Sequence, residues 1–160
     1  MKKIIILGLF FFASLGANAE ENWINIGKTD ESNFYINFKS IEEAYDYNNT
    51  YVKSWIKSVI YNDITKDGLS VGDITMTLYY SNCSKNQLGV KTLIAYKNNK
   101  PFGSQINNTH PDMRDVIPET MGKLIFDYSC KGNEFIKDEK AKAQRLIDAY
   151  NKQHGDVGRH

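Results

Sequence analysis

The chain has 160 residues, a formal net charge of +1 and two cysteines. A chain of this length is expected to fold as one domain around one core, and its balanced charge argues against a protein that binds nucleic acid. Beyond residue 19 no apolar run is long enough to span a bilayer, so we expect no stable membrane insertion of the mature chain.

Residues 1–19 have the three parts of a secretory signal peptide. Lys2 and Lys3 precede an uncharged apolar run, and Ala17-Asn18-Ala19 is a signal peptidase motif. We therefore expect cleavage after Ala19 and export to a bacterial periplasm, with secretion or cell-surface association as alternatives. No cysteine lies near the cleavage point, so no lipid anchor is expected. Removing the leader leaves 18 basic and 19 acidic side chains.

The first part of the mature chain predicts β-strands. Residues 22–27 and 33–38 are expected to form a hairpin, and 39–49 a polar connection with one helical turn after Ser40. The segment from Tyr51 to Tyr61 is ambiguous, because its apolar residues recur at helical spacing while nearly all of them are strand formers. We predict a strand there, followed by a loop over 64–73.

The middle of the chain predicts a three-stranded antiparallel meander over residues 74–82, 88–97 and 102–108. A turn is expected at 98–101. In the second of these strands, alternation predicts that Lys91 and Lys97 share one face. The opposite face would carry the apolar side chains Leu88, Val90, Ile94 and Tyr96.

The last part of the chain predicts two helices. Residues 109–120 are expected to form a loop, and a short helix near 118–128 is expected to end before Cys130, with Gly132 beyond its end. A second, amphipathic helix is predicted over 133–153 with Asn133 as its N-cap, and a disordered tail over 154–160. The fold class predicted for the whole is α+β, with a mostly antiparallel sheet of about six strands.

Cys83 and Cys130 could form a metal site, a catalytic thiol, a redox pair or a structural disulfide. There is no Cys-x-x-Cys motif, and no histidine lies at ligand spacing from either cysteine. We therefore predict no metal and no other cofactor. An exported chain meets an oxidising compartment, so we expect a disulfide between the two, worth roughly 4 kcal/mol in the chain-entropy model.

Several segments, taken in order, resemble the surface-adhesin protein E-like domain family. They are WINIG, FYINFKSI, YVKSWIKSVIY, TLYYSNC with LGVKTLIAY, and VIPETMGKLIFDYSC. The resemblance covers about residues 22–131, which predicts such a domain over 20–132. It implies a mostly antiparallel sheet packed by a helix, a strand at Tyr51–Tyr61, joined cysteines, no catalytic residues, and binding of host extracellular proteins. Two features depart from the family, namely the missing lipid-anchor motif and the charged helix after Cys130.

Charge is distributed unevenly along the mature chain. No acidic residue occurs between Asp73 and Asp112, and this stretch contains the basic side chains Lys85, Lys91, Lys97 and Lys100. We predict that these lysines form a basic sheet face that binds a protein partner, either a host extracellular matrix protein or an envelope protein. The plainer interpretation is that they solvate exposed strands and protect sheet edges.

Catalytic groups are few. His110 lies near Asp112 and Asp115 on a proline-containing loop, which makes a small hydrolase one alternative function. A polar loop is the plainer interpretation, so we predict a protein that is not an enzyme. Trp23 and Trp55 are interpreted as core or sheet-face residues. A periplasmic inhibitor or envelope accessory protein is the alternative within the binding class.

Overall fold

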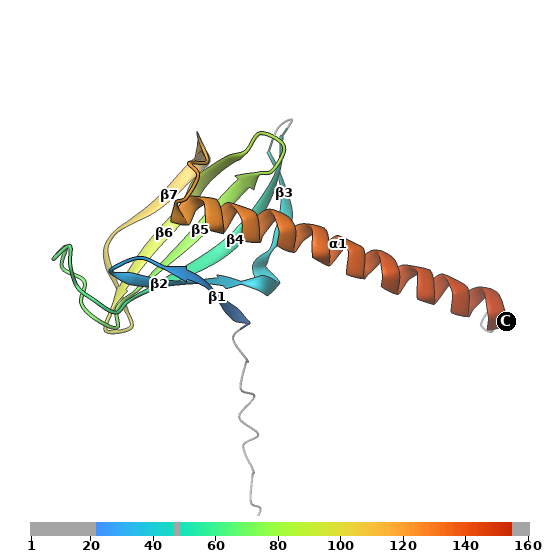
Figure 1. Ribbon diagram of the computed structural model, residues 1–160, viewed down its shortest axis with the longest axis horizontal. Helices are drawn as coiled ribbons and strands as arrows, with labels where there is room; N and C mark the ends of the chain where they lie inside the picture. The colour runs from blue at the N-terminus through green and yellow to red at the C-terminus, as the bar shows by residue number, and fades with distance from the viewer. Residues whose placement is uncertain (1–21, 47–48, 155–160) are drawn as a thin grey trace, which may run out of the picture.

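The computed structural model of the protein describes residues 22–46 and 49–154, and within them a seven-stranded antiparallel sheet is packed on one face by a long helix (Figure 1). The α+β class is therefore confirmed. The elements are β1 (Trp23–Lys28), β2 (Ser32–Asn37), η1 (Phe38–Ser40), β3 (Glu42–Asp46), β4 (Asn49–Ile60), β5 (Ile74–Asn82), β6 (Gln87–Lys97), β7 (Lys100–Asp115) and α1 (Met121–His154). The expected signal peptide and most of the expected tail lie outside the described residues.

The strand order is β1-β2-β4-β5-β6-β7, and β3 pairs with β4 beside β2. β2 and β3 share one edge of the long strand β4, because β2 pairs with its C-terminal half and β3 with its N-terminal half. The prediction of a strand at Tyr51–Tyr61 is confirmed by β4. The helical turn predicted after Ser40 instead precedes it, as η1, which ends at Ser40. β3 was missed because pairing with β4 orders a segment whose own sequence is polar.

The third strand of the meander is longer than predicted. β7 continues through residues expected to form a loop and pairs with β6 as far as Asp115. Pro111 is compatible with this because β7 is an edge strand, where a residue that lacks an N–H need not interrupt the ladder.

The two predicted helices are one continuous helix of 34 residues. Gly132 was interpreted as a helix end, but it lies within α1, where a Cβ atom would come 2.6 Å from Cδ1 of Ile41. The glycine therefore allows close approach of helix and sheet rather than ending the helix. Asn133, expected as an N-cap, is buried in the same contact region.

The core lies between the first turns of α1 and the sheet. It contains the buried side chains Ile26, Ile36, Ile41, Val52, Ile56 and Ile125. A buried hydrogen bond of 2.8 Å joins the hydroxyls of Ser54 in β4 and Ser129 in α1, and Ser129 in turn donates to the carbonyl of Ile125. These contacts fix how α1 lies across the sheet.

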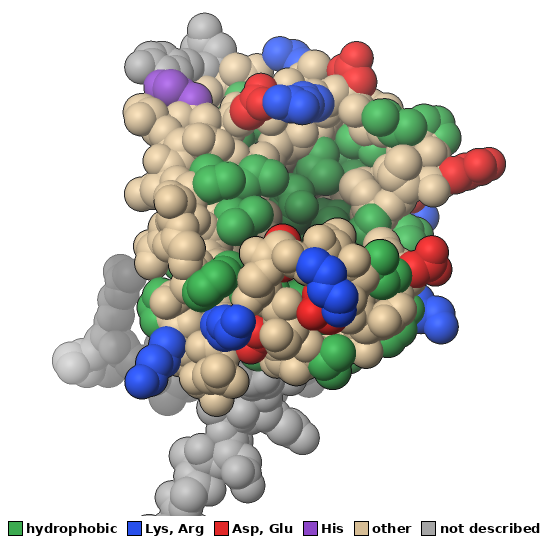
Figure 2. All heavy atoms as spheres, turned by 90° about the vertical axis from the view of Figure 1, so that its left-hand side faces the viewer, with side chains coloured by type: hydrophobic (Ala, Val, Ile, Leu, Met, Phe, Trp, Pro, Cys, Tyr) green, Lys and Arg blue, Asp and Glu red, His purple; other side chains and the backbone are tan. Residues whose placement is uncertain are grey.

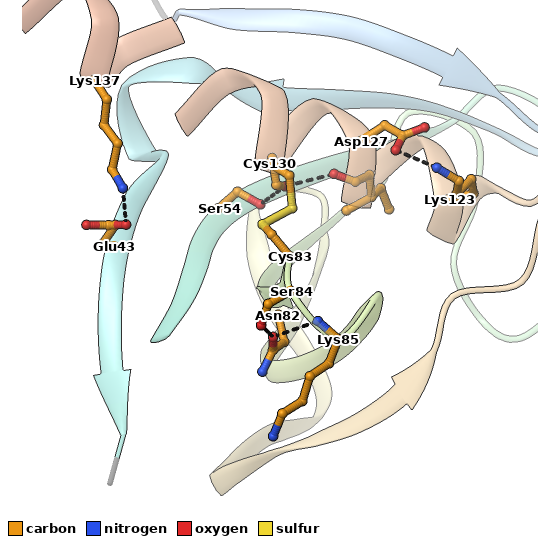
Figure 3. The surroundings of a disulfide bond; sticks show 12 residues. Glu43, Ser54, Asn82, Cys83, Ser84, Lys85, Lys123, Asp127, Cys130 and Lys137 are labelled. Atoms are coloured by element: carbon orange, nitrogen blue, oxygen red, sulfur yellow. Dashed lines mark hydrogen bonds and ion pairs between the residues drawn. A yellow bond between two sulfur atoms is a disulfide. The ribbon is translucent and has the colours of Figure 1, made fainter. Parts of the chain in front are cut away.

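The predicted disulfide between Cys83 and Cys130 is present (Figure 3). Cys83 follows the end of β5, and Cys130 lies in α1 one residue after Ser129. The bond has a sequence separation of 47 residues and ties the helix to the β5–β6 end of the sheet. Nearby, Lys137 of α1 forms an ion pair of 2.6 Å with Glu43 of β3.

Beyond this ion pair, α1 continues past the edge of the sheet (Figure 1). Every side chain described from Lys137 to Lys152 is exposed. Of the helical segments in the described residues, none has the length and apolar character needed to cross a membrane.

Candidate functional site

The face of the sheet opposite α1 is rich in aromatic and aliphatic side chains. Residues paired across neighbouring strands point to the same face, and Val52 and Ile56 point toward α1, so Trp55 and Lys57 point away from it. The register extends this opposite face through Tyr35, Met76, Leu78, Ile94 and Tyr96. These side chains are half-buried, and no described helix packs on them. Trp55 is therefore a sheet-face residue, as predicted.

A hollow of about 350 Å³ lies on this opposite face. It is lined by Trp23, Lys57, Ile74, Met76, Tyr96 and Asn99, and we call it the Trp23 hollow. The ammonium group of Lys57 lies 4.6 Å from the centre of the Trp23 ring and 5.6 Å from that of Tyr35. Aromatic faces attract a cation at such distances. The hollow thus has apolar walls and a positive charge held in place by two rings.

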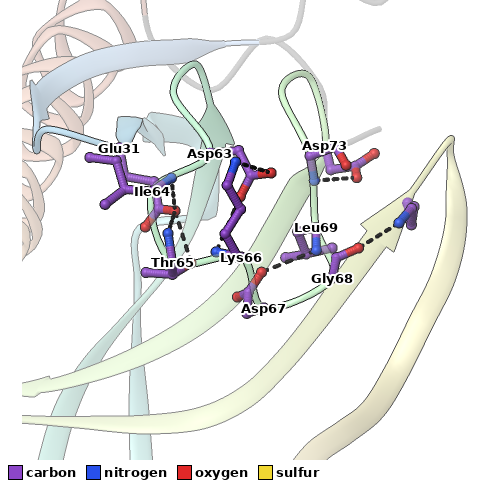
Figure 4. Close-up of polar contacts among 11 residues, drawn as sticks. Glu31, Asp63, Ile64, Thr65, Lys66, Asp67, Gly68, Leu69 and Asp73 are labelled. Carbon is purple, nitrogen blue, oxygen red and sulfur yellow. Dashed lines mark hydrogen bonds and ion pairs between the residues drawn. The ribbon is translucent and has the colours of Figure 1, made fainter.

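The turn between β6 and β7 borders the Trp23 hollow. Asn98 and Asn99 have φ angles of 50° and 61°, which suit the two-residue turn that connects Lys97 to its partner Lys100. Lys97 donates to the carbonyl of Gly68 in the β4–β5 loop (2.5 Å; Figure 4), whereas the side chain of Lys100 is exposed. The turn therefore places Lys100 at the same end of the sheet as Lys57, although its pairing with Lys97 puts its side chain on the α1 side.

Asp73 holds this turn against the β4–β5 loop (Figure 4). One carboxylate oxygen accepts the backbone N–H of Asn98 at 3.0 Å, and the other accepts that of Ser70 at 2.9 Å. The hydrogen bond from Asn98 and then that from Ser70, with the charge of Lys97, hold the pKa of Asp73 below its ordinary value. The charged carboxylate is thus the form that positions the rim of the hollow.

We expect the Asp73→Asn variant to be less stable than the wild type at pH 7. Since the pKa of Asp73 is lowered in the folded state from its ordinary 3.8, its contribution is complete above that value and is lost as the pH falls through the folded-state pKa. The difference in Tm between the two proteins should therefore shrink below about pH 4. Thermal unfolding followed by circular dichroism from pH 7 to pH 2 measures it, and a pH-independent difference would contradict this role.

The four predicted lysines do not form one cluster. Lys85 lies in the β5–β6 turn, at the other end of β6 from Lys97 and Lys100, and donates to the side chain of Asn49 (2.9 Å). Lys91 donates to the carbonyl of Thr109 in the middle of the hairpin (2.5 Å). At about 3.3 Å per residue, β6 separates its two ends by roughly 30 Å.

The predicted alternation in β6 is wrong because the strand contains a bulge. Tyr79 pairs with Val90 but its neighbour Leu78 pairs with Thr92, which leaves Lys91 as the extra residue. Leu88 and Val90 consequently lie on the α1 side of the sheet, whereas Ile94 and Tyr96 lie on the opposite face. The four apolar side chains that were predicted to share one face are therefore divided between the two faces of the sheet.

His110 does not pair with either nearby carboxylate. Its Nδ1 lies 2.9 Å from Oδ2 of Asp46 in β3, while Asp112 binds Arg114 and Asp115 accepts a bond from Gln87. Three strands separate β3 from β7 in the sheet order, a distance of roughly 19 Å if the sheet were flat. The pair therefore shows that the sheet curls until its two edges meet at this end. In residues 22–46 and 49–154, no three His, Cys, Asp or Glu side chains are placed to hold a metal ion.

A second hollow, also of about 350 Å³, lies on the α1 side of β5, β6 and β7. Its lining includes Tyr79, Leu88, Val90, Leu93 and Ile106, and Figure 2 shows apolar side chains around a depression on the side of the molecule where β7 lies. Burial raises the pKa of the Tyr79 hydroxyl. Asp112 and Arg114 at its margin bind each other, so its charges are already neutralised.

Sequence reasoning missed Lys57, Ile74 and Met76 as site residues. Lys57 lies outside the acid-free stretch, and the ambiguous pattern of its strand gave no indication of which face it would join. The pairing of β1 with β2, of β2 with β4 and of β4 with β5 brings these side chains to Trp23.

Comparison with known proteins gives one match. The family described as surface-adhesin protein E matches residues 23–131, from the first residue of β1 to the residue after Cys130. Searches of curated proteins and of solved structures find no match for the chain. The matched range includes all seven strands, both cysteines and the first turns of α1. The chain belongs to the surface-adhesin protein E family.

Proposed function

We propose that the protein is an exported, non-enzymatic domain that binds a protein partner at the Trp23 hollow. The observation that carries this proposal is the position of the Lys57 ammonium between the rings of Trp23 and Tyr35 on a face that no described element covers. Tryptophan and tyrosine are the residues that most often dominate the binding energy of protein interfaces. Export rests on the signal peptide expected from the sequence, and protein binding on the family.

The charge at the hollow favours a partner that presents carboxylates beside apolar side chains. Lys57 lies in the hollow, and Lys100 follows Asn99 at its rim, within the stretch that contains no acidic residue. A carboxylate that contacts Lys57 would also replace water at the edge of the Trp23 ring. Of the four lysines proposed from the sequence, Lys97 and Lys100 lie at this end of the sheet, but their pairing points both side chains to the α1 side, so we propose Lys57 as the basic group of the surface and Lys100 as a neighbouring charge at its edge. Host extracellular proteins and envelope proteins are the partners that we propose.

We expect the Trp23→Ala variant to bind immobilised extracellular-matrix proteins about 30-fold more weakly than the wild type, as for a typical interface hot spot. A Lys57→Glu, Lys100→Glu variant should bind more weakly and also lose the decrease in association rate with added salt. Surface plasmon resonance with the mature chain at two salt concentrations measures both effects.

The matched control for each of these two charge reversals, made singly, is Lys85→Glu, which reverses one lysine at the far end of the β5–β6 hairpin. Its affinity should be unchanged. If Lys85→Glu weakened binding as much as the Lys57 and Lys100 changes, net charge rather than the Trp23 hollow would determine binding. Circular dichroism of each variant confirms that the fold is intact.

Envelope proteins become the favoured partners if the chain remains in the periplasm. A periplasmic inhibitor or accessory protein would use the same surface, and fractionation of cells into periplasm, outer membrane and medium distinguishes the two settings. A hydrolase acting through His110 is the alternative from another class. It predicts that His110→Ala abolishes turnover of a substrate that the wild type hydrolyses.

A further inference from the structure

The outer edge of β1 has unpaired backbone groups. β1 pairs with β2 on one side, and none of the other described strands pairs with its second side (Figure 1). Phe38 donates its N–H to the carbonyl of Asn22 (3.1 Å), so that carbonyl points toward the end of β2. Because backbone groups alternate in direction along an antiparallel strand, those of Trp23 and Asn25 point outward. The first half of β1 therefore presents donors and acceptors that match those of another extended chain.

This edge lacks the features that protect the other edge strands of the described sheet. β7 contains Pro101 and Pro111, which cannot donate to a further strand, and β3 contains Glu42 and Glu43. Residues 23–26 of β1 include neither a proline nor a charged side chain. The bulge that follows in β1 limits regular pairing to its first residues, so the open stretch is short.

An apolar row of α1 lies above this edge. Leu124 lies over β1, since a Cβ atom added to Gly27 would come 3.2 Å from its Cδ1. Tyr128 and Phe135 lie on the same side of the helix, about one and three turns further along. Cys130, on the far side of the helix, is bonded to the residue after β5, so the row faces β1 and its open edge. The exposed fractions of Leu124, Tyr128 and Phe135 are 40%, 43% and 58%.

Two hollows follow the β1 side of α1 and meet at Leu124. One, of about 460 Å³, lies beside η1 and has Phe38 and Phe135 in its walls. The other, of about 470 Å³, lies between α1 and the end of β1 at Lys28 and Thr29. Together they form a groove that runs along β1, which we call the β1 groove.

The β1 groove has an apolar side chain beside it and a positive charge at its η1 end. Ile24 pairs with the core residue Ile36, so it points to the α1 side, where its exposed fraction is 46%. Lys131 lines the hollow beside η1 and makes no ion pair within the described residues, whereas Asp127 in the same hollow is bound by Lys123. The groove therefore suits an extended segment with an apolar residue opposite Ile24 and an acidic residue at one end.

We propose that an extended segment of a partner protein adds an antiparallel strand to the sheet at the outer edge of β1, with its apolar side chains in the β1 groove. Main-chain hydrogen bonds to Trp23 and Asn25 would hold this strand, and the groove would select its side chains. A strand that runs opposite to β1 has its C-terminal end near η1, so its acidic residue lies there, beside Lys131. The contact goes beyond the Trp23 hollow, since the β1 groove lies on the α1 side of the sheet.

Titration of the isotope-labelled mature chain with a short synthetic peptide, followed by NMR, tests the proposal. The peptide alternates threonine with valine and phenylalanine and ends in glutamate. We expect the amide signals of Trp23 and Asn25 to shift and their hydrogen exchange to slow, while the amides of β3 and β7 remain unchanged. The same peptide with proline in place of the two threonines beside phenylalanine should not bind, because proline cannot donate to the ladder. No saturable change up to about 1 mM of the first peptide would overturn the proposal.

Two pairs of variants test the backbone contact and the side-chain contact separately. Asn25→Pro removes the outward N–H and should weaken peptide binding about 10-fold. Asn25→Ala keeps that N–H and should bind like the wild type; both variants lose the hydrogen bond from Gly27 to the Asn25 side chain, so the alanine controls for that loss. Tyr128→Ala should weaken binding about 10-fold, whereas Tyr150→Ala, which removes an exposed tyrosine from the projecting half of α1, should not. Equal affinities for all four variants would overturn the proposal.

Amide exchange in the free protein distinguishes the other occupants of this edge. Slow exchange at Trp23 and Asn25 before peptide is added would mean that a second copy or another part of the chain already pairs with β1, and would overturn the proposal. Trp23→Ala keeps the backbone of β1 and should still bind the peptide. Loss of matrix-protein binding in that variant with retained peptide binding would separate the β1 groove from the Trp23 hollow.

Discussion

Replacing Cys83 and Cys130 together by serine is expected to lower the free energy of unfolding by about 4 kcal/mol. The disulfide closes a loop with a sequence separation of 47 residues, and its loss releases that loop in the unfolded chain. It is also the covalent connection between α1 and the β5–β6 end of the sheet. Unfolding in urea, followed by tryptophan fluorescence, measures the change directly.

The effect of the disulfide should lie mainly in stability and not in the fold itself. The buried contacts of Ile125 and the Ser54–Ser129 hydrogen bond lie on the same turns of α1 and remain in the double variant. We therefore expect a folded far-ultraviolet spectrum at low temperature, with a Tm lower by at least 10 °C. Adding a reductant to the wild type should reproduce the effect. An unchanged midpoint in urea after complete reduction would contradict it.

The Ile125→Ala variant is expected to lose about 3 kcal/mol of stability. Ile125 has an exposed fraction of 1% and is the residue through which α1 enters the core with Ile36, Ile56 and Val52. Truncation to alanine leaves a cavity that the sheet cannot fill, because its floor consists of paired strands.

Leu146→Ala is the matched control for this variant, since it removes a comparable apolar side chain from the same helix where it is exposed. Because Leu146 is exposed, the midpoint of this variant in urea should shift little. Equal losses for the two variants would mean that the projecting half of α1 belongs to the cooperative folding unit of the domain.

The parts of the fold that could be predicted from the sequence are those determined locally. Alternation and turn residues indicated β5, β6 and their hairpin, and strand-forming composition correctly outweighed helical spacing in β4. The continuity of α1 could not be predicted, because a glycine that ends a helix and one that lets a helix approach a sheet look the same in a sequence. Gly132 is explained only by its contact with Ile41, which is 91 residues away in the chain.

The candidate site was less predictable than the fold. The sequence indicated a basic stretch but not the face that it joins. Simple alternation places Leu88, Val90, Ile94 and Tyr96 on one face. The bulge at Lys91 instead puts Ile94 and Tyr96 on the face opposite that of Leu88 and Val90. The contact of Lys57 with Trp23, 34 residues away in the chain, depends on the pairing of β1 with β2 and of β2 with β4. Long-range pairing of this kind leaves no periodic signal in the sequence.

The central claim is that the face opposite α1 binds the protein partner. The most direct test is methyl NMR of the mature chain during titration with an extracellular-matrix protein that it binds. Ile74 and Met76 line the Trp23 hollow, whereas Leu93 and Ile106 line the hollow on the α1 side. We predict that the methyl signals of Ile74 and Met76 shift or broaden on binding while those of Leu93 and Ile106 remain unchanged. Perturbation of Leu93 and Ile106 with unchanged Ile74 and Met76 would contradict the claim.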